Sequence, residues 1–253
     1  MTETPTPDPG DVAAPLTRRQ RLRASTLADI QDTARRHITE LGAANLSLRA
    51  LARDLGMSAP ALYRYYDSRD ALLTDLLVDC FLSLADSLES ARDAQPEGDL
   101  GARLAAAALA YRDWALAHPA EFTLVFGAPV PGYAAPEDGP TNDAGARFGQ
   151  VFLELILTAW FERQFPVDDE ASLEPSLVAA LEQCRTDYAL PPEVPLGVLA
   201  LWLQGWGRLH GLISLEVFGH LSWVLPDGTG LFRAEVRTML DRLAVEQPSW
   251  LAR

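Results

Sequence analysis

The stretch LSLRALARDLGMSAPALYRYYDSR, residues 46–69, constrains the fold of this chain more than any other part of the sequence. Its apolar residues recur at helical spacing up to Gly56, which predicts a first short helix that is capped by Ser47 and buries one side. Gly56 stands where a helix ends in a left-handed residue, and Ser58 with Pro60 predicts the capped start of a second helix. Two short helices joined by such a corner are typical of the helix-turn-helix, whose second helix enters the major groove of DNA.

The second helix is expected to bury Leu62 and Tyr66 and to turn its other side chains outward. Small residues at its start let the backbone approach base edges, whereas tyrosine, serine and arginine side chains reach phosphates. The residues expected to contact phosphates are Ser47, Ser58, Tyr63, Tyr65 and Arg69. The residues expected to lie near base edges are Arg49, Ala59, Pro60 and Arg64. Asp67 or Ser68 is expected to cap the helix that follows.

The run LARDLGMSAPALYRYYDSRDALL, between Ala50 and Leu73, resembles the DNA-binding signature of the TetR family of bacterial transcriptional regulators. The matching positions are Gly56, Ser58, Leu62, Tyr63, Tyr66, Ser68 and Leu72. Arg69 replaces the usual lysine and Tyr65 a common histidine, and both keep a side chain that can donate to a phosphate. The resemblance implies a homodimer that binds an inverted-repeat operator in double-stranded DNA. In most members of the family the protein is a repressor that a small hydrophobic effector releases.

The net charge of −14 argues, by itself, against a nucleic-acid-binding protein. The charges are unevenly distributed, because residues 17–70 hold ten arginines against six acids, whereas residues 71–253 carry a net charge of −15. A basic head on an acidic body orients toward a duplex while the body is repelled from it. The distribution therefore favours DNA binding by the N-terminal part.

The apolar spacing elsewhere is also helical, so we expect an all-α chain whose three-helix, helix-turn-helix domain precedes a larger helical domain. The expected parts are a disordered tail at 1–16, a DNA-binding domain at 17–70, and an effector-binding and dimerisation domain at 71–253. The other expected helices are one with Leu27, Ile30, Ala34, Ile38 and Leu41 buried, and those at 68–91, 100–118, 147–165, 170–188, 196–222 and 231–243. The helix at 68–91 would act as a lever between the two domains.

Two basic or irregular segments have alternative interpretations. TRRQRLR, residues 17–23, is either an arm that lies in the minor groove or the solvated start of the first helix. The segment at 127–143, with four prolines and three glycines, is either a mobile cover over a ligand entrance or a variable insertion.

Aromatic residues concentrate between positions 111 and 160, which makes an apolar effector pocket plausible, although they also suit an ordinary core. The expected effector-binding residues are Tyr111, Trp114, Phe122, Phe126, Phe148, Phe152 and Trp160. Neither a cofactor nor a metal ion nor a catalytic residue is expected.

The segment 196–222 is helical in period but contains four glycines, each of which costs a helix about 1 kcal/mol relative to alanine. Close approach of another backbone would compensate for this cost. GWGRLHGLISLE resembles the Trp-His-Gly motif of one C-terminal subclass of TetR-like regulators, which implies a helix near a dimer interface. The expected interface residues are Leu199, Leu203, Trp206, His210 and Ile213.

Other classes of protein are weakly supported by the sequence. Cys80 and Cys184 are expected to be buried free thiols, and no run of apolar residues reaches the roughly 20 that span a bilayer, so a cytoplasmic protein is expected. The acids at 168–170 suggest a metal site in a helical enzyme, but acids at a helix start ordinarily complement the helix dipole. A helical effector-binding or partner-binding protein without DNA recognition remains a further alternative.

Overall fold

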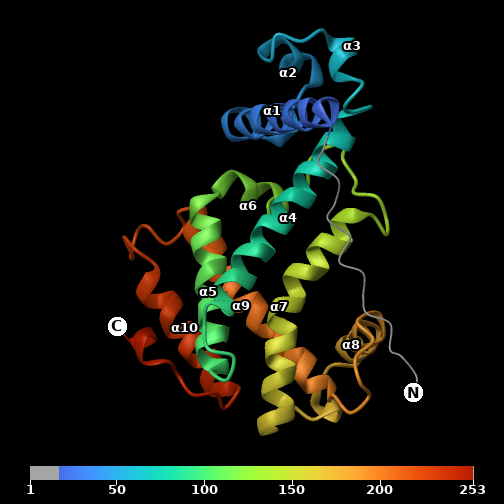
Figure 1. The fold of residues 1–253 in the computed structure, drawn as a ribbon. Coiled ribbons are helices and arrows are strands. Elements are labelled where there is room, and N and C mark those ends of the chain that lie inside the picture. Colours follow the sequence, from blue (N-terminus) through green and yellow to red (C-terminus); the bar gives the residue numbers. More distant parts are fainter. Residues whose placement is uncertain (1–16, 253) are drawn as a thin grey trace, which may run out of the picture. The chain divides into compact units, whose positions relative to one another are not determined.

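A computed structural model describes residues 17–252 of the chain, and the predicted disordered tail at 1–16 lies outside these residues. Within the described residues the regular structure consists of α-helices and short 3-10 helices, without a β-strand (Figure 1). The all-α fold class is therefore confirmed. By its internal contacts the chain divides into two units, Met1–Leu72 and Leu73–Arg253.

The first unit is a small helical domain around one apolar core. Its elements are α1 (Arg18–Leu41), η1 (Ala43–Asn45), α2 (Leu48–Asp54), α3 (Ala59–Leu62) and the first turn of α4 (Arg69–Asp93). Ile30, Ala34 and Leu51 are fully buried, as the helical spacing predicts, because they lie on the sides that α1 and α2 turn toward each other. The prediction is wrong for Leu41, which is 55% exposed at the last residue of α1.

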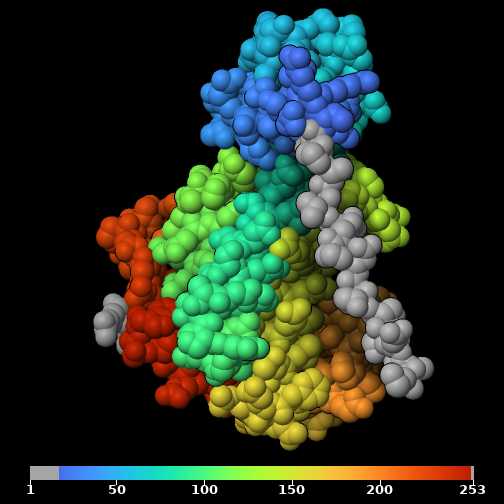
Figure 2. Space-filling view, in the orientation of Figure 1, coloured from blue at the N-terminus to red at the C-terminus, as the bar shows by residue number. Residues whose placement is uncertain are grey.

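The second unit contains the remaining helices. They are the rest of α4, α5 (Leu100–Ala117), α6 (Pro119–Phe126), α7 (Pro140–Arg163), η2 (Glu170–Ser172), α8 (Pro175–Asp187), α9 (Leu196–Val217), α10 (Thr229–Arg242) and η3 (Ser249–Ala252). α9 packs against α5, α7, α8 and α10, so it is the central helix of this unit (Figure 1). α4 and α7 lie side by side (Figures 1 and 2), and Arg147 of α7 donates to Glu89 of α4 at 2.9 Å and to Asp86 at 2.7 Å.

Several helix ends differ from the sequence prediction, and the predicted helix 170–188 is divided into η2 and α8. Three of the differences have a clear local reason. α7 begins at Pro140 because proline suits the first position of a helix, so the irregular segment is 127–139 instead of 127–143. α7 ends at Arg163 because Gln164 adopts a left-handed conformation with φ of 47°. α9 ends at Val217, two residues before Gly219 with its φ of 71°.

A buried ion pair ties α5 to the end of α9 and to the start of α10. Arg112 is only 6% exposed, and its Nε and Nη2 donate to the two carboxylate oxygens of Glu216 at 2.7 and 2.6 Å. The same Nη2 donates to Asp227 at 3.2 Å, and the backbone N–H of Gly228 donates to Glu216 at 3.1 Å. The two ends of the connection between α9 and α10 are thereby held together.

Candidate functional site

The corner between α2 and α3 is closed by hydrogen bonds that place a glycine in a left-handed conformation. Gly56 has φ of 64°. The N–H of Met57 donates to the carbonyl of Ala52 at 2.8 Å, and the N–H of Gly56 donates to that of Arg53 at 3.1 Å. This pair of bonds is the Schellman motif, which ends a helix and reverses the chain. The predicted role of Gly56 is confirmed, and the corner sets the direction of α3.

The short helix α3 has one buried and one exposed side. Leu62 is fully buried and Tyr66 is 5% exposed, as predicted. Pro60 and Arg64 are exposed on the other side, together with Tyr63, which is 43% exposed. The N–H of Tyr63 donates to the carbonyl of Ala59, and that of Tyr66 to Leu62, so helical hydrogen bonds continue past the last residue of α3. The chain therefore presents a rigid helical surface with two polar side chains and a proline.

Ser47 and Ser58 occupy the N-cap positions of α2 and α3, as predicted. The predicted cap hydrogen bonds are wrong, since neither side chain caps its helix. The hydroxyl groups of Ser47 and Ser58 therefore make no cap hydrogen bond. Ser58 and the nearby Arg49 are exposed. Ser68, in contrast, accepts the N–H of Ala71 at 3.0 Å and caps α4.

Two of the predicted phosphate-binding side chains have partners within the first unit. Nη2 of Arg69 donates to the carbonyl of Ala43 at 2.9 Å and to that of Ala44 at 3.3 Å, so this side chain holds the η1 turn. The ring of Tyr65 is half-buried, and the guanidinium carbon of Arg23 lies 5.1 Å from its centroid, within the range of a cation–π contact. These contacts orient both side chains.

The basic segment 17–23 is the start of α1 and not a separate arm. Thr17 and Gln20 form a capping box, in which Thr17 N–H donates to the Gln20 side chain at 2.8 Å and Gln20 N–H to the Thr17 hydroxyl at 3.3 Å. The four arginines of this segment, Arg18, Arg19, Arg21 and Arg23, are exposed. Positive charge at a helix N-terminus is disfavoured by the helix dipole, and a bound anion would relieve this repulsion.

α1 and α2 are also joined by a polar contact that sequence reasoning missed. Nε2 of His37, a buried residue, lies 2.7 Å from Oδ2 of Asp54. This hydrogen bond is the main cause that lowers the pKa of Asp54 below its usual value. The pair fixes the last turn of α2, and with it the corner, against α1.

Five of the seven predicted effector-binding side chains come together in the second unit. Tyr111 lies edge-on to Phe148 with ring centroids 5.1 Å apart, and Phe126 lies 5.2 Å from Phe122 and 6.0 Å from Phe148. The ring of Phe148 lies edge-on to that of Phe152, with centroids 6.5 Å apart. We call Tyr111, Phe122, Phe126, Phe148 and Phe152 the aromatic cluster.

The other two predicted side chains lie elsewhere in the second unit. Trp114 stacks on His118 at 5.2 Å and donates to Ser83 at 3.1 Å, and Trp160 packs edge-on against Phe165 at 5.4 Å. Trp114 and Trp160 therefore take no part in the aromatic cluster.

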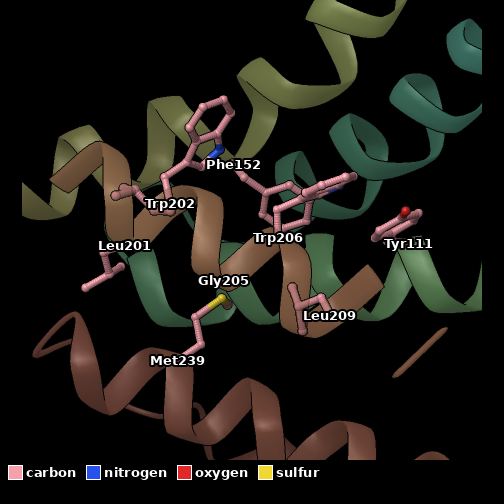
Figure 3. Close-up of a pocket in the computed structure, with 9 residues that line it drawn as sticks. Tyr111, Phe152, Leu201, Trp202, Gly205, Trp206, Leu209 and Met239 are labelled. Atoms are coloured by element: carbon pink, nitrogen blue, oxygen red, sulfur yellow. The ribbon is translucent and has the colours of Figure 1, made fainter. Parts of the chain in front are cut away.

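A small cavity lies beside the aromatic cluster, between α5, α7, α9 and α10 (Figure 3). Its lining residues are Tyr111, Phe152, Ile156, Leu201, Trp202, Gly205, Trp206, Leu209 and Met239. Its free volume is about 10 Å³, which is space for roughly one water molecule. Sequence reasoning missed the contributions of α9 and α10, although the tryptophans of α9 were a visible signal.

The predicted dimer residues on α9 do not share one exposed side. Leu199 and Ile213 are fully buried in the core of their own chain, so they offer no surface to a second copy. Leu203 is 42% exposed, Trp206 is 36% exposed, and His210 is half-buried.

The exposed side of α9 follows a different set of residues, whose helical spacing places them on one face. This α9 face consists of Leu203, Gly207, Gly211, Leu215 and Phe218, of which Gly211 is half-buried and Phe218 directly follows the last residue of α9. A Cβ atom built on Gly207 or Gly211 has no atom within 4 Å, whereas one on Gly197 lies 2.3 Å from the carbonyl oxygen of Asp168. The predicted close approach of another backbone is therefore confirmed at Gly197, while Gly207 and Gly211 border open space.

The acidic run at 168–170 has a local structural role. The carboxylate of Asp169 accepts the N–H of Ala171 at 3.4 Å and caps η2. In the described part of the chain, no group of three or more His, Cys, Asp and Glu side chains is arranged to hold a metal ion. None of the helices between residues 17 and 252 has both the length and the apolar character that crossing a bilayer requires.

Two family profiles match this chain. "Bacterial regulatory proteins, tetR family" matches residues 30–76, and "Tetracyclin repressor-like, C-terminal domain" matches residues 104–239. An HTH-type transcriptional regulator from Mycobacterium tuberculosis is 36% identical over 228 residues, which cover 90% of this chain and 96% of the relative.

Solved structures give the same result. The regulatory protein SCO4313 is 36% identical, with a TM-score of 0.72 over 89% of this chain and 100% of the other. A protein with unknown function from Rhodococcus sp. RHA1 shares the fold at 24% identity, with a TM-score of 0.62 over 92% of this chain and 98% of the other.

Proposed function

Because the chain belongs to the TetR family of bacterial transcriptional regulators, we propose that it binds an inverted-repeat operator as a homodimer and represses transcription until a small hydrophobic effector releases it. The chain is a DNA-binding regulator of transcription. The observation that carries the proposal is the exposed side of α3, with Tyr63 and Arg64, in a part of the chain whose net charge is positive. The proposal includes no catalytic residue or cofactor, and it places the protein in the cytoplasm, where bacterial DNA lies.

The DNA-binding residues divide into two groups by the kind of contact that each side chain can make. We assign phosphate contacts to Tyr63 and to the hydroxyl groups of Ser47 and Ser58, which do not cap their helices. Tyr65 and Arg69 belong to the same group, although both are oriented by contacts within the first unit. We assign base contacts to Arg49, Ala59, Pro60 and Arg64, because an arginine pairs well with guanine and small residues permit close approach.

The start of α1 adds a further basic surface to the first unit. Arg23 contacts the ring of Tyr65, which follows α3, so this end of α1 lies beside the proposed DNA-binding surface. Phosphates bound there would relieve the unfavourable charge at the helix N-terminus. The exposed Arg18 and Arg19 would then extend the phosphate contacts beyond those of α3.

The α9 face supports a homodimer. Leu203, Leu215 and Phe218 are 42%, 39% and 43% exposed, which is unfavourable for large apolar side chains unless they are covered. Gly207 and Gly211 between them leave space for a second helix to approach closely. A second copy of α9 related by a two-fold axis would cover the same residues on both chains.

The aromatic cluster supports an apolar effector, and its contacts suggest how binding is transmitted. Phe126 lies edge-on to Phe81 of α4 at 5.9 Å. The segment after Phe126 contains Tyr133, whose hydroxyl lies 3.0 Å from that of Thr74 on α4. Since α4 begins in the first unit at Arg69, a shift of α6 on effector binding would move a helix that enters the DNA-binding unit.

The test of DNA binding first selects a preferred DNA sequence from a random pool with the native protein. It then compares how two variants of the protein bind this sequence and unrelated DNA. We expect Tyr63→Ala to weaken binding to the selected and to unrelated DNA alike, by about tenfold, because it removes a phosphate contact. We expect Arg64→Ala to weaken binding to the selected sequence by about tenfold to a hundredfold with little effect on unrelated DNA. Mobility-shift titrations at one salt concentration measure both.

The control is Arg163→Ala, which removes an exposed arginine of the second unit and should change neither affinity. Unchanged affinity after Tyr63→Ala would remove Tyr63 from the DNA-binding surface. If the selection enriches no sequence, the proposal that this chain recognises an operator is wrong.

A further inference from the structure

A histidine with two hydrogen-bond partners lies among the aromatic rings of the second unit. Nδ1 of His210 is 2.7 Å from the hydroxyl of Tyr111, which is fully buried, and Nε2 is 3.3 Å from the hydroxyl of Ser214. The indole of Trp206 stacks on the imidazole at 5.0 Å, and Phe122 stacks on it at 5.6 Å. Aromatic rings therefore stack on the faces of the imidazole, and its hydrogen bonds are made by the two ring nitrogens at its edge.

The three polar groups in this arrangement are uncharged. Burial lowers the pKa of His210, so the imidazole is neutral near pH 7. Burial raises the pKa of Tyr111, an effect that a hydrogen bond from the Trp206 side chain only partly opposes, so the phenol keeps its proton. His210 contacts Tyr111, Ser214 and aromatic rings, and none of these side chains supplies a charge.

Stability alone does not require such a network, on general physical grounds. Replacing both partners of a buried hydrogen bond by apolar groups of the same shape is often neutral or stabilising. A phenylalanine pair would fill the space of Tyr111 and His210 without the cost of desolvating two polar groups. The polar edge of His210 is therefore better explained by a ligand than by stability.

The cavity shows where a ligand would reach this edge. Tyr111 and Trp206, two of the side chains that contact His210, also line the cavity between α7 and α10 (Figure 3). Because the cavity has a free volume of only about 10 Å³, a ligand must displace part of its wall. Trp206 is the exposed residue of this wall, at 36%, and a two-ring system has about the size of its indole.

We propose that Tyr111 and His210 form the polar anchor of the effector pocket, from which the effector displaces the Ser214 hydroxyl, and that the effector is an uncharged molecule with a flat apolar ring system and one hydroxyl or carbonyl oxygen. The ring system takes the place of the Trp206 indole on the imidazole. The oxygen takes the place of the Ser214 hydroxyl at Nε2, because that contact is the longer of the two. A carboxylate is excluded, since no cation among residues 17–252 contacts His210 to compensate for the desolvation of the carboxylate.

This inference rests on the effector pocket of the proposed function. Three probes with the same two-ring skeleton test the polar anchor separately from the pocket itself. Naphthalene, 1-naphthol and 1-naphthoate are titrated into the full-length protein, with tryptophan fluorescence and calorimetry as readouts. We expect 1-naphthol to bind about tenfold more tightly than naphthalene, because it gains one hydrogen bond. We expect 1-naphthoate to bind more weakly than 1-naphthol.

Three substitutions test whether the preference for 1-naphthol over naphthalene comes from the polar anchor. Tyr111→Phe and Ser214→Ala each remove one oxygen and keep the packing, and His210→Phe removes the imidazole. We expect Tyr111→Phe and His210→Phe to reduce the preference for 1-naphthol over naphthalene. Ser214→Ala removes the hydroxyl that the ligand oxygen displaces, so it should retain the preference, and the affinity for naphthalene should stay within twofold in all three variants. His220→Phe, which changes an exposed histidine, is the control and should leave the preference unchanged.

Each contrary outcome overturns a different statement. Equal binding of naphthalene and 1-naphthol overturns the polar anchor but leaves the apolar pocket. Tightest binding of 1-naphthoate overturns the uncharged class of ligand. If none of the three probes binds to protein that still binds its operator, both the pocket and its anchor are wrong, whereas the DNA-binding part of the proposed function stands.

Discussion

Gly207→Leu is expected to make the protein monomeric and to weaken operator binding by about a hundredfold or more. Gly207 is exposed on the α9 face, and a Cβ atom there meets no atom of its own chain within 4 Å. The substitution therefore fits the monomer and gains about 0.8 kcal/mol of helix propensity. A second α9 helix that approaches closely at this position would instead meet a leucine side chain, and the interface would be lost.

The loss of operator affinity follows from the loss of bivalency. A dimer that holds two DNA-binding units binds its second half-site as an intramolecular step, which raises affinity by about a hundredfold or more. Light scattering after gel filtration measures the oligomeric state, and mobility shifts with one and two half-sites measure affinity. We expect the affinity for a single half-site to change little.

Ala180→Leu is the matched control, because it adds the same exposed side chain to α8 instead of α9. It should remain dimeric. A variant Gly207→Leu that stays dimeric at micromolar concentration would remove the α9 face from the interface, even if the protein is a dimer through another surface.

The features predicted correctly from sequence depend on residues close together in the chain. The Schellman motif at Gly56 and the buried pair Leu62 and Tyr66 are set by a few neighbouring positions, so periodicity and capping rules were sufficient. The caps of α2 and α3 were wrong, because a serine at the N-cap position can turn its hydroxyl away from the helix. Sequence alone does not specify that rotamer.

The exposed side of α9 was not predictable by the same rules. The helix is apolar around most of its circumference and packs against four other helices, so its apolar pattern does not mark a single buried side. Leu199 and Ile213 are covered by the same chain, while Leu203 is not. Which side remains free is decided by the paths of α5, α7, α8 and α10, which the local sequence of α9 does not contain.

The effector residues were predicted from their proximity in the sequence, which explains the partial agreement. Trp114 lies on the same helix as Tyr111, but its indole N–H donates to Ser83 of α4, and the spacing along α5 does not reveal this partner. The partner of Tyr111 is His210, ninety-nine positions later, and only the fold brings the two together. The domain boundaries and the Trp-His-Gly subclass remain predictions.

Glu216→Ala is expected to lower the free energy of unfolding by about 3 kcal/mol, because it leaves the buried guanidinium of Arg112 without its main partner. The hydrogen bonds of Glu216 raise the pKa of Arg112 in the native protein. The guanidinium also stays charged in the variant, because arginine is effectively always protonated in proteins. Asp227 offers only one longer contact at 3.2 Å, and it is 69% exposed. The N–H of Gly228 also loses its acceptor.

Urea unfolding of Glu216→Ala in the Gly207→Leu background measures this effect without a contribution from dimerisation. Glu235→Ala is the control, since Glu235 on α10 pairs with Arg208 of α9 at 3.4 Å and Arg208 is 47% exposed. A pair with such an exposed partner contributes less than about 1 kcal/mol. The double variant Arg112→Met, Glu216→Leu should recover most of the loss, because an apolar pair replaces a buried ion pair at little cost. If Glu216→Ala costs no more than Glu235→Ala, the ion pair does not stabilise the connection between α9 and α10, and packing around Phe232 must hold it instead.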